Sequence, residues 1–284
     1  MDTILQYLTD VLLATLMHLA ILLAPIMILG LIMHVISQKI EELTCNIVGK
    51  QWYLILFGWI GTAVHELGHL IFALIFGHHI SNVKLFSFDA NNPELGYVKH
   101  SFNKKNIYQN LGNFLIGIGP ILLGGSALFI IGYFLLDINF NTLINSNLKI
   151  ISSSTTESVR SIFFSLYNEL MSIIKTIIQN DHIVWWKYVL FFYLLFSIGS
   201  SISLSKSDIK GSFSGLLLFV GLVLLFNIST LWLGNFATSI FTIVSNVVSG
   251  FYLILLVSIV FNLGFLLLLW LINLIVPAKK VKKK

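Results

Sequence analysis

The stretch GTAVHELGHLIFALIFG, Gly61 to Gly77, carries two histidines and a glutamate inside a run that is otherwise apolar. Ionisable side chains are unfavourable in hydrocarbon, and those found within membrane helices generally have a function. The stretch therefore predicts a membrane-spanning helix that carries a functional site.

The composition of the 284-residue chain indicates a membrane protein. Hydrophobic residues make up 57% of it and charged residues 10%, and the mean hydropathy is +0.91, outside the range of soluble globular domains. Windows of roughly 20 apolar residues are each long enough to cross about 30 Å of hydrocarbon as a helix. We predict an all-α polytopic fold with about six spans, at 11–36 (interrupted only by Pro25), 52–76, 107–136, 183–203, 213–233 and 248–276.

The basic residues predict how the spans are oriented. The tail KKVKKK, Lys279 to Lys284, is expected on the cytoplasmic side by the positive-inside rule, and six spans then place the N-terminus there too. The net charge of +5 suits anionic lipid headgroups better than nucleic acid. We expect a multi-pass protein of a bacterial cytoplasmic membrane, with the lipid bilayer around it, and the sequence does not indicate an oligomeric state.

Two segments outside the spans have a pattern of their own. Residues 79–102 contain two strand-like runs, Val83 to Phe88 and Gly96 to Phe102, separated by the turn composition DANNPE, which predicts a membrane-associated β-hairpin. Residues 139–181 show apolar residues at helical spacing and are predicted to form an amphipathic helix on the outer surface. With the basic tail at 277–284, the whole chain is predicted to be one transmembrane domain.

The pattern His65-Glu66-x-x-His69 predicts a zinc site. Residues four apart lie on one face of a helix, so both imidazoles reach one metal ion. In such sites the glutamate does not bind zinc but takes a proton from zinc-bound water and passes it to the leaving amine. One cysteine, Cys45, excludes a multi-cysteine zinc site. We therefore expect one Zn²⁺ per chain, with Glu66 as the catalytic base.

Asp208 is the predicted third ligand, and depth in the membrane favours it. Six spans place Asp208 near the cytoplasmic end of the span that carries His69, whereas Asp137, Asp181 and His182 belong to the opposite side. An alternative is purely structural, since Ser205 or Ser207 could cap a helix whose first turn contains Asp208.

Three features together resemble the site-2 protease family of intramembrane zinc metalloproteases, of which this chain would be a divergent member. They are HELGH within a span, the following passage LIFALIFGHHISNVKLFSF into a hairpin, and a distal aspartate. The family carries an Asn-x-x-Pro-x-Pro-x-x-Asp-Gly motif whose aspartate binds zinc. The aligned stretch here is SSISLSKSDIKG, with serines 200, 203 and 205 in place of the asparagine and both prolines. GIGP, Gly117 to Pro120, is similar to a Gly-Pro turn in the family's next helix. The resemblance implies that Asp208 binds zinc.

The predicted function is that of a zinc metalloendopeptidase that hydrolyses peptide bonds of membrane-embedded substrates. The hairpin either pairs with the unwound substrate or covers the metal cavity. Rival functions that use the same ligands are a metal transporter and a non-catalytic protein that binds membrane helices. Membrane proteases that trim prenylated proteins would need a glutamate as third ligand, for which Glu157 or Glu169 would have to serve.

Other polar residues in apolar surroundings are left out of the predicted site. His18 and His34 are interpreted as hydrogen-bonded core residues of the first span. His78, His79 and His100 lie near the hairpin, where they could assist metal uptake or simply be solvated. Asn113, close to Gly117 and Pro120, is a candidate contact for substrate or for a neighbouring helix.

Overall fold

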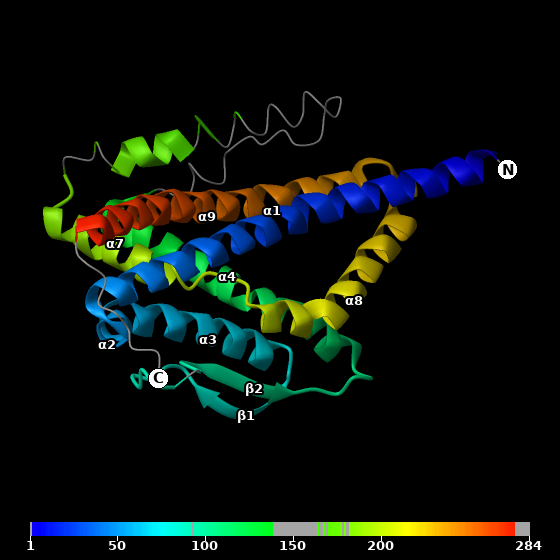
Figure 1. Cartoon of the computed structure of the whole chain (residues 1–284). Coiled ribbons are helices and arrows are strands. Elements are labelled where there is room, and N and C mark those ends of the chain that lie inside the picture. Colours follow the sequence, from blue (N-terminus) through cyan, green and yellow to red (C-terminus); the bar gives the residue numbers. More distant parts are fainter. Residues whose placement is uncertain are drawn as a thin grey trace.

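The computed structural model describes residues 2–92, 94–138 and 182–275, together with residues 164, 167–168, 170–177 and 179. It is built from helices and one small antiparallel sheet (Figure 1). The elements are α1 (Asp2–Val48), α2 (Lys50–Tyr53), the π-helix η1 (Leu54–Gly58), α3 (Trp59–Ile75), β1 (His79–Lys84), β2 (Tyr97–Ser101), α4 (Ile107–Leu136), α7 (Trp185–Gly199), α8 (Lys206–Thr230), the 3₁₀ turn η2 (Leu231–Leu233) and α9 (Asn235–Ile275).

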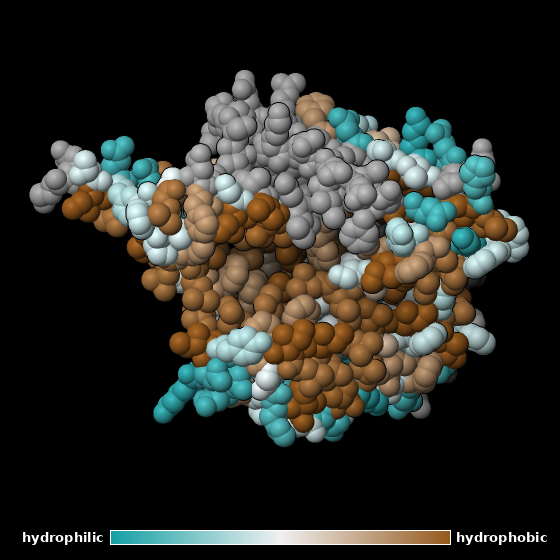
Figure 2. All heavy atoms as spheres, turned by 180° about the vertical axis from the view of Figure 1, so that it is seen from behind, coloured by the Kyte–Doolittle hydropathy of each residue, from teal (hydrophilic) through white to brown (hydrophobic). Residues whose placement is uncertain are grey.

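Five helices in the described ranges are long and apolar enough to cross a membrane. They are the runs Thr3–Val48, Lys50–Ile75, Ile107–Leu136, Lys206–Leu233 and Gly250–Ile275. The face drawn in Figure 2 is broadly hydrophobic, with hydrophilic residues gathered towards its margins, as expected for a surface in contact with lipid. Helix α4 has the bounds that the sequence predicts, whereas the predicted span 183–203 is the 15-residue helix α7.

Helix α1 continues through Pro25, where the sequence suggests an interruption. A proline has no backbone N–H, so the carbonyl four residues earlier, that of Ile21, loses its helical donor. The Tyr252 hydroxyl of α9 donates to this carbonyl at 2.8 Å and to the Leu22 carbonyl at 3.0 Å. A side chain from a neighbouring helix thus satisfies the freed carbonyl, and the helix is not broken.

Helices α1 and α9 run side by side in the same direction (Figure 1). His18 stacks on Phe241, Ile21 contacts Tyr252, and Met33 packs in one cluster with Ile259, so residue numbers rise together along both helices. Residues 2 and 275 therefore lie at opposite ends of the bundle. This arrangement gives no support to the prediction that both termini face the cytoplasm, and because the tail 277–284 lies outside the described residues, the orientation stays a prediction.

Helices α7 and α8 follow one another along a single partner, α4. Gly132 of α4 faces Phe191, Gly124 faces Ile198 and Ile202, Gly117 faces Asp208 and Ser212, and Gly215 of α8 faces Phe114. As numbers fall along α4 they rise from α7 into the first turns of α8, so these parts of the two helices pack in turn along α4, with residues 200–205 between them. Lys206–Leu233 is by itself long and apolar enough to cross a membrane, whereas α7 is shorter, so the count of six spans stays a prediction. Of the polar residues between the two helices, Ser200 is buried, and Lys206 and Lys210 are exposed.

The hairpin is present, with its first strand earlier than predicted. Strand β1 starts at His79 rather than Val83, and its pairing with β2 joins Ile80 to His100 and Lys84 to Tyr97, with an irregularity between residues 80 and 82. The reason is a tight exit from α3: Gly77 has φ of +66°, and the next residues pair at once. The side chain of Gln109 ties the hairpin base to α4, because its Nε2 donates to the Gly77 carbonyl and its Oε1 accepts from the Asn103 amide, both at 2.7 Å.

Two predicted segments lie largely or wholly outside the described residues. Of the segment 139–181, predicted as an amphipathic helix on the outer surface, the structure describes a helical stretch at 170–177, whose Ile173 and Ile177 are buried in the main core, and residues 164, 167–168 and 179. The other residues of that segment and the basic tail 277–284 are not described.

Candidate metal centre

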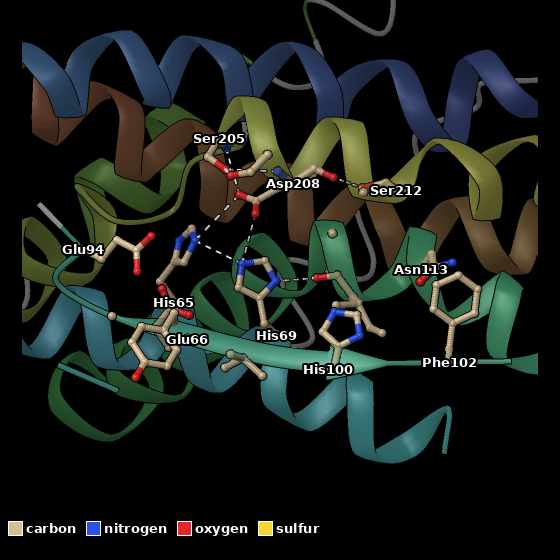
Figure 3. Close-up of a pocket in the computed structure, with 17 residues that line it drawn as sticks. His65, Glu66, His69, Glu94, His100, Phe102, Asn113, Ser205, Asp208 and Ser212 are labelled. Atoms are coloured by element: carbon tan, nitrogen blue, oxygen red, sulfur yellow. Dashed lines mark hydrogen bonds and ion pairs between the residues drawn. The ribbon is translucent and has the colours of Figure 1, made fainter. Parts of the chain in front are cut away.

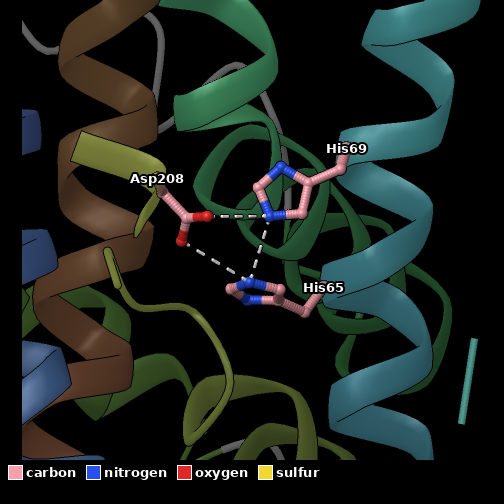
Figure 4. A group of neighbouring side chains, drawn as sticks. All are labelled: His65, His69 and Asp208. Carbon is pink, nitrogen blue, oxygen red and sulfur yellow. Dashed lines mark hydrogen bonds and ion pairs between the residues drawn. The ribbon is translucent and has the colours of Figure 1, made fainter. Parts of the chain in front are cut away.

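His65, His69 and Asp208 converge on one point inside the bundle (Figure 4). The Nε2 atoms of the two histidines are 3.3 Å apart, and His69 Nε2 lies 3.3 Å from Asp208 Oδ1. His65 Nε2 lies 3.8 Å from Asp208 Oδ2. When ligands lie about 2.0–2.1 Å from a tetrahedral zinc ion, neighbouring ligand atoms are about 3.3 Å apart. The three side chains could therefore hold a metal ion, and their spacing fits zinc.

Both histidines are oriented as metal ligands by backbone carbonyls. His65 Nδ1 is 2.8 Å from the Ser201 carbonyl, and His69 Nδ1 is 2.8 Å from the Ile116 carbonyl. A carbonyl only accepts, so each Nδ1 carries the hydrogen and each Nε2 presents a lone pair to the centre. This second contact fixes the ring and its tautomer, as is general for histidines that bind metals.

Pro120 explains why the Ile116 carbonyl is free to accept from His69. Inside α4, residue 120 would normally donate its N–H to the carbonyl of residue 116, but a proline has none. His69 supplies the missing donor from α3. The sequence GIGP thus contributes to the centre through the hydrogen bond that its proline leaves unmade.

Asp208 both caps a helix and faces the histidines. Ser205 is the N-cap of α8: its hydroxyl accepts from the Asp208 amide at 3.1 Å, while Asp208 Oδ2 accepts from the Ser205 amide at 2.9 Å. The other oxygen, Oδ1, faces His69. The capping interpretation and the ligand interpretation therefore hold together, because the cap aims the carboxylate at the centre.

Close packing of backbones brings the three elements together. A Cβ atom added at Gly68 of α3 would lie 2.6 Å from Pro120 N and 2.7 Å from Gly119 C, and one at Gly117 would lie 2.9 Å from the Asp208 carbonyl oxygen. Small residues at these crossings permit close contact between membrane helices. The His65–His69 face of α3 is thereby held against α4 and the start of α8.

Glu66 lines the same cavity, which has a volume of about 530 Å³ (Figure 3). Its side chain is buried, and the hairpin passes directly over it, since a Cβ atom at Gly96 would lie 2.6 Å from Glu66 Cγ. Gly96, Val98, His100 and Phe102, which alternate along the β2 segment and so share one face of it, line the cavity together with Tyr97. The face of the hairpin therefore forms one wall of the cavity.

Within the described residues, no further carboxylate considered from the sequence belongs to this cluster. Asp137 ends α4 in a left-handed conformation (φ of 52°), and Asp181, Glu157 and Glu169 lie outside the described residues. His182 is exposed. Sequence reasoning missed the carbonyls of Ser201 and Ile116, since a backbone acceptor has no residue signature. Of the two carbonyls, only that of Ile116 could have been found from the sequence, because Pro120 lies four residues after it.

A comparison with protein-family models gives no match, and comparisons with curated proteins and with solved structures give none either. The resemblance to site-2 proteases therefore rests on the residues and their geometry alone.

Proposed function

We propose that this protein is an intramembrane zinc metalloprotease that cleaves membrane-embedded peptides. The observation that carries the proposal is the convergence of two oriented Nε2 atoms and one carboxylate, 3.3–3.8 Å apart, beside a buried glutamate in the same cavity. A metal-binding site that serves only structure has no use for such a glutamate, whereas hydrolysis needs a base at this position.

His65, His69 and Asp208 would hold the zinc ion. When bound, zinc supplies a Lewis acid that polarises a peptide carbonyl and lowers the pKa of water towards neutrality. Three protein ligands leave the open position that a catalytic site needs.

Glu66 moves the proton in this reaction. Its carboxylate takes a proton from the water as the new C–O bond forms at the peptide carbonyl carbon, and then delivers that proton to the amide nitrogen, so that the C–N bond breaks and the amine leaves. The wall made by the hairpin lies over Glu66, where Gly96 approaches its side chain. A peptide must be extended to place its carbonyl here, because a helical substrate keeps its amides in internal hydrogen bonds.

Metal removal tests the proposal. The purified protein is reconstituted in liposomes with a reporter peptide of about 20 apolar residues that carries a central pair of glycines and a fluorophore–quencher pair. We expect about one zinc per chain by mass spectrometry, loss of cleavage after chelation, and recovery with one equivalent of Zn²⁺. Undiminished cleavage by the metal-free protein would overturn the proposal. So would zinc flux across the liposomes without cleavage, which would indicate a transporter.

A further inference from the structure

A second pair of histidines, His78 and His100, lies beside the metal centre. His78 follows the Gly77 turn and is 5% exposed, and its Nδ1 is 2.9 Å from Nδ1 of His100 on β2. Its Nε2 is 2.8 Å from the Gln109 carbonyl of α4, and the Phe102 ring stacks on it with centroids 5.1 Å apart. His78 is thus held from three sides.

These contacts fix the hydrogen positions of both rings. The Gln109 carbonyl only accepts, so His78 donates from Nε2. A neutral imidazole has one ring hydrogen, so His78 Nδ1 must accept from His100 Nδ1, and His100 Nε2 then bears a lone pair and no hydrogen. Burial, together with the neighbouring rings of His78 and His69, lowers the pKa of His100 and keeps its ring neutral.

His100 thus shares the arrangement of the two histidine ligands. In all three residues Nδ1 donates to a fixed partner, and all three line one cavity (Figure 3). His100 nevertheless lies outside the only group of three or more possible metal ligands, within the described residues, whose ligand atoms all approach one another within 4.8 Å. Its lone pair is therefore assigned to the substrate rather than to the metal.

An extended substrate peptide requires hydrogen-bond acceptors in the cavity, and His100 Nε2 can provide one. Each peptide N–H released from a helix is unfavourable in a cavity unless it finds a new acceptor. Nearby Asn113 directs its Nδ2 away to Ser214 Oγ of α8, at 3.1 Å. His100 carries the fixed imidazole acceptor on the hairpin side.

We propose that His100 binds the substrate by accepting a hydrogen bond from one backbone N–H of the extended peptide, with His78 as the positioning residue that locks it in the accepting form. The proposal rests on the proposed function, because it names how that site holds its peptide. In this proposal the wall of the cavity formed by the hairpin takes part in substrate binding through His100 of β2.

Two substitutions of His100 test this with the reporter peptide in liposomes. His100→Phe keeps a ring but has no acceptor, and we expect KM to rise about tenfold with kcat and zinc content unchanged. His100→Gln keeps an acceptor oxygen at similar reach and is expected to stay within about threefold of the parent. His78→Phe, which keeps the stack on Phe102 but frees the tautomer of His100, is expected to raise KM about threefold.

A backbone ester scan of the reporter separates binding from a structural role. Each peptide N–H near the cleavage site is replaced by oxygen in turn. At one position the ester should raise KM about tenfold for the parent but leave KM unchanged for His100→Phe, because that variant has already lost the contact. If the parent cleaves while His100→Phe keeps the parent KM, or if no ester position shows this dependence, His100 does not bind the substrate. If the zinc-loaded parent does not cleave at all, the proposed function fails and this inference fails with it.

Discussion

Two prolines inside membrane helices, Pro25 in α1 and Pro120 in α4, have the same local effect and opposite consequences. Each leaves a carbonyl without its helical donor, at Ile21 and at Ile116. Tyr252 of α9 donates to the first, and His69 of α3 donates to the second. The hydrogen bond from Tyr252 joins the parallel helices α1 and α9, and the hydrogen bond from His69 orients a candidate metal ligand.

The same contrast extends to the polar residues around each proline. Along α1, His18 Nδ1 and, on the neighbouring α8, Asn227 Oδ1 are buried without a hydrogen bond among the described residues, although Asn227 Nδ2 reaches Thr15 Oγ1 of α1 at 2.9 Å. At the metal centre, each histidine and the aspartate has a fixed partner behind it. Ionisable groups in a membrane are thus better indicators of a site when they converge and are oriented than when they are merely present. Four predictions test this contrast.

The largest effect is expected from Glu66→Gln. Loss of the proton acceptor should lower kcat by about 10²–10⁴-fold, while zinc content stays at the parent level because Glu66 is not a ligand. Cleavage of the reporter measures kcat, and metal analysis of the same preparation measures the zinc content. Glu41→Gln in α1 is the matched control and should retain activity. Equal cleavage by Glu66→Gln and the parent would contradict the assignment.

Asp208→Asn is expected to weaken zinc binding by about 100-fold or more, since a neutral amide replaces the anionic ligand. The asparagine oxygen can still accept from the Ser205 amide, so α8 keeps its cap and folding should change little. Competition with a zinc-sensitive dye measures the affinity. Asp137→Asn, at a left-handed position that asparagine tolerates, is the control. Unchanged affinity in Asp208→Asn would remove Asp208 from the ligand set.

Pro120→Ala should weaken zinc binding by about tenfold, because the new N–H competes with His69 for the Ile116 carbonyl. The same substitution at Pro25 restores a helical bond far from the centre and should leave zinc affinity unchanged. The dye competition applies to both variants. If both variants lose zinc affinity to a similar extent, or if neither loses it, the two prolines do not differ as inferred.

The smallest effect is expected from Tyr252→Phe. Removing the hydroxyl leaves the Ile21 carbonyl without this donor, which should cost about 1 kcal/mol of stability, with zinc content and cleavage unchanged. Thermal unfolding in detergent measures the stability, and the reporter assay measures cleavage. Loss of zinc in this variant would mean that the α1–α9 pair is coupled to the centre.

The predictions from sequence succeeded where a local pattern carries the information. Helix α4 has its predicted bounds because its apolar run is continuous and Asn106 caps it at the start. The spacing of His65 and His69 puts both rings on one face of any helix, so two of the three candidate ligands needed no tertiary information. The hairpin followed from two strand-like runs around a turn, although its first strand was placed four residues late.

The surroundings of the segment between α7 and α8 could not be obtained in this way. Hydropathy falls around residues 200–211, and a polar interruption between apolar runs is the usual mark of a loop between spans. Within this stretch Ser201 and Asp208 meet His65 and His69 inside the bundle, whereas Lys206 and Lys210 are exposed. A hydropathy average over a window cannot distinguish polar residues that face water from polar residues that contact one another inside the protein.

The sequence by itself indicated a membrane protein, the helix that carries His65 and His69, and the chemistry that these side chains offer, because hydropathy and i, i+4 spacing are local properties. Only the tertiary structure decided that α7 and the first turns of α8 pack in turn along α4, that Asp208 faces the histidines, and that the carbonyl freed by Pro120 accepts from His69. These relations depend on how separate helices pack, and close approach at Gly68 and Gly117 sets that packing.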